Sequence, residues 1–424
     1  DFKREWLIDW ANKRVEADGI NFYQGFYERL STQARTYWVD INQDAVNRSF
    51  MTQLRRVDFA LDLCHRIFED VVGKGLNACI VSGNSHVTPF SAFRDFARAK
   101  DDPKFNFINC NVAYESYFSN LGGKFATTMA VTDMTLHRNR RAPFMALRTD
   151  FERWYEANKN DASFRARADE MITTNRNSST NSVSQDQLVD WLAAERSAGK
   201  KVLCAFGKVP VDLNVPYDGG PAHSEMADWL NHTVQIAREC PELVLLVKPH
   251  PHELRPEIAL DLIEGFTDLI DGPVPSNVRL LGHREINVHA LAPHLDIALL
   301  WNGSSSLELT ALGIPVLMAA YFGRHDYPVD LIYPESRDQY AAYLKAGEFP
   351  LPSDDLRERA AFLIAYMGTD EISIRNEYSY RQITNDKVGI PRWRKDEVEN
   401  FMTFGDPGIS TIASRMVEKF TAAS

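Results

Sequence analysis

Residues 243–253 read LVLLVKPHPHE, an uninterrupted apolar run that passes directly into a polar loop with two prolines. A short apolar run without alternation is typical of a strand buried on both faces of a parallel sheet. The prolines hold the following backbone extended and keep a helix from starting at once. This stretch therefore predicts an α/β sheet, with Lys248 and His250 held at the edge where the strand ends.

Similar short apolar runs lie on both sides of this strand. Strands are expected at 201–206 (KVLCAF), 296–301 (DIALLW) and 315–319 (PVLMA), and an amphipathic helix at 226–240. Short strands alternating with helices predict a doubly wound open sheet. In such sheets ligands bind beyond the carboxyl ends of the strands, so the loops that follow the strands are the candidate site.

The loop at 248–253 carries groups that suit a phosphate. Lysine and histidine side chains donate hydrogen bonds to phosphate oxygens, and the proline-stiffened backbone would hold them in place. The alternative is a stiff strand-to-helix loop with solvated histidines. Two histidines and Glu253 are also metal-ligand types, but no further cluster supports them, so we expect no metal.

A second polar loop follows the DIALLW run. Its glycine, polar and acidic residues are Asn302, Gly303, Ser304, Ser305, Ser306 and Glu308. The glycine permits close backbone approach, and the serines present hydroxyl and N–H groups at a helix N-terminus, where an anion is favoured. A capping box between Ser305 and Glu308 is the competing interpretation and needs no ligand. Three serines exceed what a cap requires, so we favour nucleotide binding.

A third loop, residues 212–224 (DLNVPYDGGPAHS), follows the first strand of the second half. Asp218-Gly219-Gly220 is by itself a turn pattern. At the same sheet edge, Asp218 and His223 become candidates for contacting a bound ligand.

The first half predicts a second sheet. Residues 3–72 look mainly helical, whereas 77–81 (NACIV) and 104–112 (KFNFINCNV) look like strands and 125–131 like a weaker one. Helical stretches between them predict βα units and a parallel sheet.

Two residues of the first half lie after its predicted strands, in positions that correspond to those of the polar loops in the second half. His86 and Glu115 are candidate general bases, because group transfer to a hydroxyl commonly uses an imidazole or a carboxylate at the reacting centre. A lone histidine more often has neither role. The sequence does not choose among His86, Glu115 and Asp218.

A polar segment separates the two halves. Residues 173–187 (TTNRNSSTNSVSQDQ) have almost no apolar content and predict a linker. We therefore expect a first α/β domain at 1–185, a second at 186–400, and a C-terminal helix at 401–424 that packs back on the first.

Composition excludes some classes of function. The net charge of −11 over 424 residues is unfavourable for nucleic-acid binding, and gives no support to membrane contact beyond a local patch. Five scattered cysteines without close pairs indicate a reducing, cytoplasmic setting rather than disulfides or structural zinc. The sequence has no apolar stretch of membrane-spanning length and no signal peptide at its start.

The polar loops together resemble the capsule polysaccharide biosynthesis family, which includes bacterial Kdo transferases, and more distantly bacterial sialyltransferases. The matching residues are His250-Pro251, Ser304-Ser305, the segment 308–316 (ELTALGIPV) and the aromatic loop 321–327 (YFGRHDY) with Arg324. The resemblance covers 201–334. It implies a GT-B fold, with two Rossmann-like domains facing a cleft, and activity without a metal or other cofactor.

In the family, the His-Pro and Ser motifs hold the CMP moiety of the donor, so the resemblance implies that role for His250, Ser304 and Ser305. The sialyltransferases carry two acidic residues before a glycine as the catalytic motif. Here Tyr217-Asp218-Gly219 has one. Because of this difference, the resemblance does not decide whether Asp218 is the catalyst.

The expected function is therefore a glycosyltransferase. It would move a Kdo- or sialic-acid-like sugar from a CMP-activated donor to a glycan or glycolipid acceptor of a capsule or lipopolysaccharide, in the cytoplasm or in peripheral contact with the membrane or an assembly complex. A CDP-glycerol-type phosphotransferase, a nucleotide-sugar epimerase and a non-catalytic assembly scaffold are the alternatives.

Overall fold

A computed structural model describes most of the chain. The described residues are 2–114, 124–133, 148–173, 182–212, 219–254, 262–303, 305–320, 328–367, 369, 374–384, 387–388 and 392–406, with short pieces up to 418. The chain divides into two compact units. The first contains Asp1–Ala34, Trp38–Ala146 and Tyr366–Ser424, and the second contains Arg35–Tyr37 and Leu147–Ala365.

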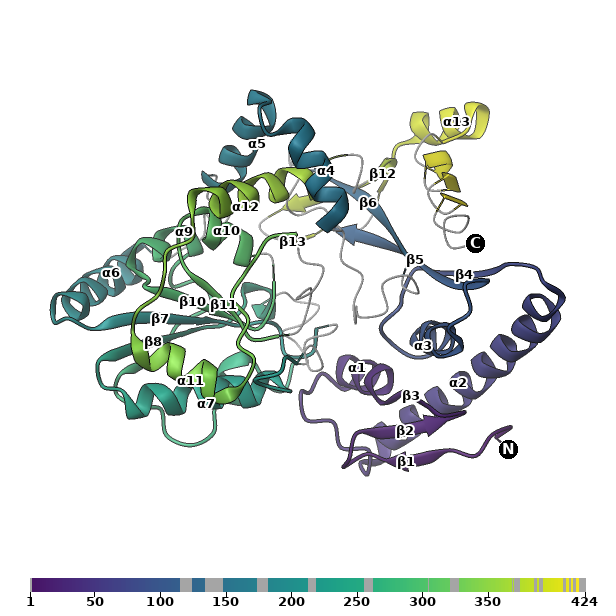
Figure 1. Cartoon of the computed structure of the whole chain (residues 1–424), viewed down its shortest axis with the longest axis horizontal. Coiled ribbons are helices and arrows are strands. Elements are labelled where there is room, and N and C mark those ends of the chain that lie inside the picture. Colours follow the sequence, from purple (N-terminus) through teal and green to yellow (C-terminus); the bar gives the residue numbers. More distant parts are fainter. Residues whose placement is uncertain are drawn as a thin grey trace. The chain divides into compact units, whose positions relative to one another are not determined.

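The second unit is built on a parallel sheet of five strands (Figure 1). Its strands are β7 (Lys201–Phe206), β8 (Leu243–Lys248), β9 (Val278–Leu280), β10 (Ile297–Leu300) and β11 (Val316–Met318). Their order is β11-β10-β7-β8-β9, and every pair is parallel. The α/β class and the open parallel sheet predicted from the apolar runs are confirmed.

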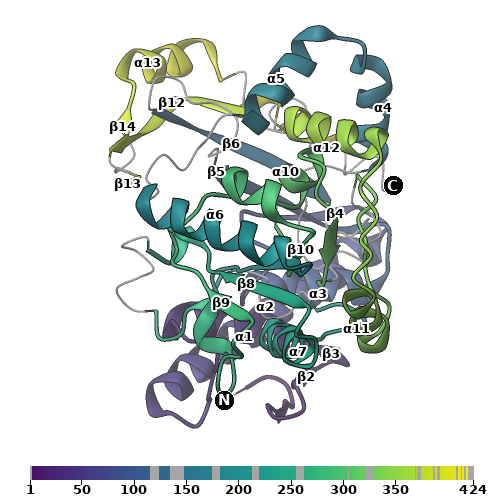
Figure 2. The ribbon, with the colours of Figure 1, turned by 90° about the vertical axis from the view of Figure 1, so that its left-hand side faces the viewer.

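Helices cover both faces of this sheet, and α6 and α7 lie on opposite faces (Figure 2). Leu203, Leu245 and Leu299 pack with α7 and α11 on one face, whereas the next residue of each strand packs with α6 and α9 on the other. The alternation follows from the twofold periodicity of strands and explains why the runs are apolar throughout. The helices are α6 (Ser182–Ser197), α7 (Met226–Glu239), α9 (Val288–Leu291), α10 (Ser305–Ala311) and α11 (Arg337–Ala346), with 3-10 turns at Phe266–Leu269 and Ala292–His294.

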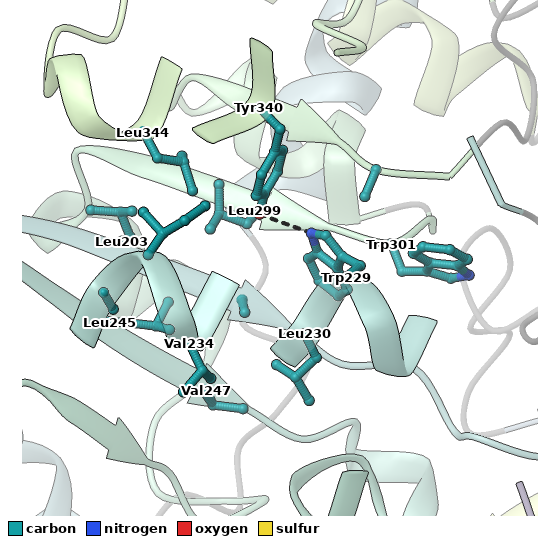
Figure 3. Close-up of a cluster of buried hydrophobic side chains, with 14 of the residues drawn as sticks. Leu203, Trp229, Leu230, Val234, Leu245, Val247, Leu299, Trp301, Tyr340 and Leu344 are labelled. Atoms are coloured by element: carbon teal, nitrogen blue, oxygen red, sulfur yellow. Dashed lines mark hydrogen bonds between the residues drawn. The ribbon is translucent and has the colours of Figure 1, made fainter. Parts of the chain in front are cut away.

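A hydrogen-bonded aromatic pair lies inside the core between the sheet, α7 and α11 (Figure 3). Trp229 Nε1 donates to the Tyr340 hydroxyl at 2.9 Å, and that hydroxyl lies 2.7 Å from Thr233 Oγ1. A short N-terminal piece joins the same core. Tyr37 is buried there, and its hydroxyl accepts the backbone N–H of Ala227.

Three further helices belong to the second unit: α4 (Arg148–Asn158), α5 (Ala162–Thr173) and α12 (Asp354–Met367). Trp154 and Tyr155 contact Phe362, and Arg359 Nη1 donates to both carboxylate oxygens of Glu152. The expected domain boundary near 185 was therefore wrong, because the second unit already includes residues 147–185. A polar composition marks 173–187 as a loop, but it does not tell which core the flanking helices join.

The first unit holds a mixed sheet. Its strands are β4 (Ala78–Ser82), β5 (Phe105–Tyr114), β6 (Lys124–Asp133) and β12 (Ile374–Thr384), with β13 (Lys387–Val388) and β14 (Arg392–Trp393) paired to β12. Only β4 and β5 run parallel, whereas β6 is antiparallel to both β5 and β12. The predicted parallel sheet is thus correct for the first pair alone. Residues 115–123 between β5 and β6 are too few for the crossover that a parallel pair requires.

The C-terminal part of the chain belongs to this first sheet. β12 pairs with β6, and α13 (Lys395–Phe404) lies against β12 (Figure 1). The expected second domain, 186–400, therefore ends too late, since the structure assigns residues from 366 onward to the first unit.

The start of the chain differs from the helical prediction. β1 (Leu7–Asp9), β2 (Arg14–Ala17) and β3 (Ile20–Asn21) form an antiparallel sheet, and helices begin only with α1 (Tyr23–Ala34) and α2 (Asp44–Asp70). Asp18 and Gly19 have positive φ and make the tight turn between β2 and β3. Trp10, which directly follows β1, packs on Tyr23 of α1. A 3-10 turn at Val72–Lys74 and α3 (Phe90–Lys100) also belong to the first unit.

Candidate functional site

The strand order of the five-stranded sheet has a switch point at β7 and β10. From β7 the chain moves to β8 and β9 on one side, and then crosses to β10 and β11 on the other. The loop after β7 leads to α7 on one face, whereas the loop after β10 leads to α10, whose Leu309 packs on the opposite face. Loops that leave two neighbouring strands in opposite directions create a crevice, and this is where open α/β sheets bind ligands.

Lys248 ends β8 at this edge. Its side chain is only 4% exposed, and its Nζ donates to the backbone oxygen of His283 at 3.4 Å. Burial lowers the pKa of the ammonium, while nearby Cys204 and Glu285 act in the opposite direction. A buried lysine that bonds a neighbouring loop supports the shape of the site as well as its charge.

The loop after β8 orients His250. Pro251 opens a 3-10 turn, Pro251–Leu254, so the extended segment is shorter than expected from the two prolines. Proline suits the first position of such a turn because its backbone needs no hydrogen-bond donor there. His250 Nδ1 accepts the backbone N–H of His252 at 3.1 Å. A neutral His250 therefore carries its proton on Nε2, which makes that nitrogen a donor.

Glu253 links this loop to the loop after β9. Its carboxylate is buried, and Oε2 lies 2.9 Å from His283 Nε2. The same carboxylate accepts the backbone N–H of Phe266 at 3.4 Å. Among the described residues no three His, Cys, Asp or Glu side chains gather as a metal site. Glu253, which the sequence suggested only as a metal ligand, holds two loops together.

The loop after β10 is tightly folded on itself. Asn302 is buried, and Gly303 has φ of +126°, a conformation that L side chains rarely adopt. The fully buried Ser306 donates from Oγ to the Gly303 oxygen at 2.7 Å. This hydroxyl therefore stabilises the loop. Ser304, expected to bind the nucleotide, lies outside the described residues.

Glu308 does not have the position of the proposed capping box. α10 begins at Ser305, so Ser305 is itself a helical residue rather than the cap, and Glu308 is the fourth residue of the helix. Its Oε2 is 3.9 Å from His289 Nε2 of α9. This contact joins two helices on the same face of the sheet.

The glycine pair after Asp218 approaches the backbone beyond β11. A Cβ on Gly220 would lie 2.4 Å from the Ala319 oxygen, and Gly219 forms a bridge with Ala320. His223 turns into the protein, where its Nε2 lies 2.8 Å from His232 Nδ1 and its ring packs against Tyr340. Burial lowers the pKa of His223 to about 3. Asp218 itself lies outside the described part of the chain.

Of the two candidate bases in the first unit, His86 is described by the structure and Glu115 is not. His86 is buried after β4, and burial, with help from Arg94 and Arg98, lowers its pKa to about 3. Its Nδ1 has no hydrogen-bond partner among the described residues. Glu115 of this unit, and Arg324 of the second unit, fall in segments that the structure does not describe.

The structure thus brings the β8 loop and the β10 loop to one edge, on either side of β7. Lys248, His250 and Pro251 lie on one side, and Asn302 to Glu308 on the other. Sequence reasoning missed Lys208 and His283, which directly follow β7 and β9. Their position shortly after a predicted strand could have indicated them, but neither has a proline- or serine-rich motif around it.

No protein-family model matches the chain, and no curated protein matches it significantly. Solved structures similar to it include two Kdo transferases and an epimerase. A β-Kdo 2,4 transferase KpsC of Thermosulfurimonas dismutans is 12% identical over 76% of this chain and 86% of that one, with a TM-score of 0.32. A β-Kdo 2,7 transferase KpsC of the same organism is 14% identical over 73% and 89%, with a TM-score of 0.31.

The third is a UDP-GlcNAc 2-epimerase of Neisseria meningitidis bound to UDP-GlcNAc. It is 14% identical over 44% of this chain and 51% of that one, with a TM-score of 0.23. Kdo transferases are thus among the similar structures, as the resemblance of the loops predicted.

Among the described helices, none combines the length and apolarity needed to cross a bilayer.

Proposed function

We propose that the chain is a metal-independent glycosyltransferase of the GT-B type. Its second unit binds a CMP-activated, Kdo- or sialic-acid-like sugar, and the acceptor is a glycan or glycolipid of a capsule or lipopolysaccharide. The observation that carries the proposal is the placement of the KPHPHE and NGSSSLE loops on either side of β7, at the carboxyl edge of a doubly wound sheet.

Each loop has a distinct task in this proposal. The Nε2–H of His250 donates to the donor phosphate, and the rigid Pro251 turn keeps the ring in place. Asn302 and the backbone around Gly303 approach the nucleotide closely because no Cβ intervenes at 303. Ser304, Ser305 and Glu308 remain proposed donor contacts, whereas Ser306 supports the loop from within.

The transfer reaction requires a base and a leaving group. The acceptor oxygen attacks the anomeric carbon, its proton goes to a base, and the bond to the CMP phosphate breaks with the electron pair leaving on the phosphate. Cations and N–H donors at the phosphate stabilise that charge. Asp218, Glu115 and His86 remain the proposed bases, and the low pKa of His86 keeps its imidazole neutral at pH 7.

A thermal-shift panel with CMP, CDP, UDP, GDP and ADP tests the proposal, since a ligand of the folded state raises the melting temperature. The variant is His250→Ala. The matched control is His294→Ala, because His294 precedes β10 at the opposite edge of the same sheet. At CMP near 100 times Kd, wild type gains about 2.7 kcal/mol, and a tenfold weaker variant gains about half as much.

We expect the loss in His250→Ala and not in His294→Ala. If CMP stabilises both variants as it does wild type, the β8 loop does not hold the phosphate. Stabilisation by UDP or GDP in place of CMP would move the donor to another sugar nucleotide. No response to any nucleotide would favour the assembly-scaffold alternative.

A further inference from the structure

Lys208 lies at the switch point of the strand order, at the carboxyl edge of the sheet. It follows β7, the central strand, by one glycine, and β7 and β10 are the neighbouring strands whose connections leave in opposite directions. Neither the β8 loop nor the β10 loop contributes a lysine here, since Lys248 lies at the end of β8 on the other side of β7.

The residue before Lys208 sets the direction of the chain. Gly207 N donates to the Lys248 oxygen at 2.8 Å, which extends the β7–β8 pairing by one residue. A Cβ on Gly207 would lie 2.5 Å from the Phe266 ring and 3.1 Å from the Lys248 oxygen. Glycine is therefore required at 207, and the backbone leaves the sheet at the next residue, Lys208.

The Lys208 side chain extends along the β10 loop. A Cβ on Gly303 would lie 3.8 Å from Lys208 Cδ, in ordinary van der Waals contact. The aliphatic stem of the lysine thus runs past Gly303, the residue at which the β10 backbone is open to close approach. The two loops meet at the crevice through this lysine.

The charge of Lys208 is accessible. Its side chain is 24% exposed, and Nζ lies 4.0 Å from Asp212 Oδ2, at the outer limit of an ion pair. Lys248, in contrast, is almost completely buried and directs its Nζ to the His283 oxygen. An ammonium on a flexible stem binds phosphate as a point charge and can exchange a distant carboxylate for a closer anion.

We propose that Lys208 binds the phosphate of the nucleotide at the crevice between β7 and β10, with its stem against Gly303. The proposal rests on the proposed nucleotide site and adds a residue to it. Lys248 then shapes the neighbouring loop through His283, and the ion pair with Asp212 is replaced when the nucleotide binds.

The test compares CMP with cytidine, which lacks the phosphate, by calorimetric titration of the full chain. Lys208→Met keeps the stem and removes the charge. Lys201→Met is the matched control, because Lys201 begins the same strand at the amino edge of the sheet and has a similarly loose ion pair, 3.9 Å from Asp296. Thermal unfolding of both variants without ligand checks that they fold.

We expect Lys208→Met to raise the Kd for CMP about 10-fold or more, the effect of losing one charge-assisted hydrogen bond. Cytidine binding should not change, and Lys208→Arg should recover part of the CMP affinity. Lys201→Met should bind both ligands as wild type does.

Three results would overturn the inference while leaving the nucleotide site in place. These are unchanged CMP binding by Lys208→Met, an equal loss for CMP and cytidine, and an equal loss of CMP affinity in Lys201→Met. Failure of wild type to bind any nucleotide overturns the proposed function itself, and the inference with it.

Discussion

Removal of one hydroxyl group tests how the core of the second unit is held together. In Tyr340→Phe, the ring remains and the oxygen is lost. That oxygen accepts from Trp229 Nε1 at 2.9 Å. Thr233 Oγ1 donates its proton to the Trp229 oxygen at 2.7 Å, so Tyr340 must donate to Thr233. The hydroxyl thus makes two hydrogen bonds among side chains that are almost completely buried.

The size of the effect follows from the groups left behind. The Trp229 N–H loses its acceptor in a place that water does not reach, which costs about 1–3 kcal/mol. Losing the donor to Thr233 adds to this, so we expect about 2–3 kcal/mol in total. For a unit of this size, each kcal/mol lowers the melting temperature by about 2–4 °C. The expected decrease is therefore about 4–12 °C.

The control is the same substitution one turn further along α11. The Tyr343 hydroxyl is buried and has no hydrogen-bond partner among the described residues. Tyr343→Phe should therefore leave the melting temperature unchanged or raise it slightly. Calorimetric scans of the two variants beside wild type make the comparison. If they unfold at the same temperature, the Trp229–Tyr340–Thr233 network does not contribute as described.

Two further changes test other features of the second unit. His223 has a folded pKa of about 3 against an ordinary value of 6.5, so the unfolded chain binds more protons between these values and stability falls as pH decreases through them. His223→Asn should reduce this loss of stability by up to about 1.4 kcal/mol per pH unit, measured by urea titrations from pH 6.5 to 4. His232, Asp228 and Arg337 also influence the pKa of His223. If the variant loses stability with pH as steeply as wild type, burial of His223 is not the cause. Gly220→Ala should destabilise the protein by more than about 2 kcal/mol, because the new Cβ would lie 2.4 Å from the Ala319 oxygen. In the control Gly282→Ala, the new Cβ makes only ordinary contacts, so stability should change by less than about 1 kcal/mol. Equal effects of the two substitutions in thermal melts would refute the clash.

Much of the second unit was readable from the sequence because its strands are local features. LVLLV (243–247) and IALLW (297–301) are buried on both faces, so every residue is apolar and each run identifies a strand without its partners. The alternation of strands and helices then places the loop after each strand at one edge. For this reason the positions of His250 and Gly303 at a common edge could be predicted.

Pairing between distant segments was not readable in this way. β12 pairs with β6, although more than two hundred residues separate them in the sequence. The local periodicity of a strand does not indicate which other strand it pairs with. The same limit explains the wrong boundary near 185. Aromatic residues of α4 predict a buried face, but whether that face meets α12 or the first unit depends on the assembled core.

The sequence by itself determined the α/β character of the second unit and the chemistry of its loops, since both follow from residue type and short spacing. Only the tertiary structure decided which polar side chains lie at the carboxyl edge of the sheet and which are buried inside the protein. His223 and Ser306 are used inside the protein, whereas Lys208, without any motif, lies at the opening beside Gly303. The reason is physical: the direction of a side chain after a strand is set by contacts with residues far away in the chain, and these exist only once the sheet has formed.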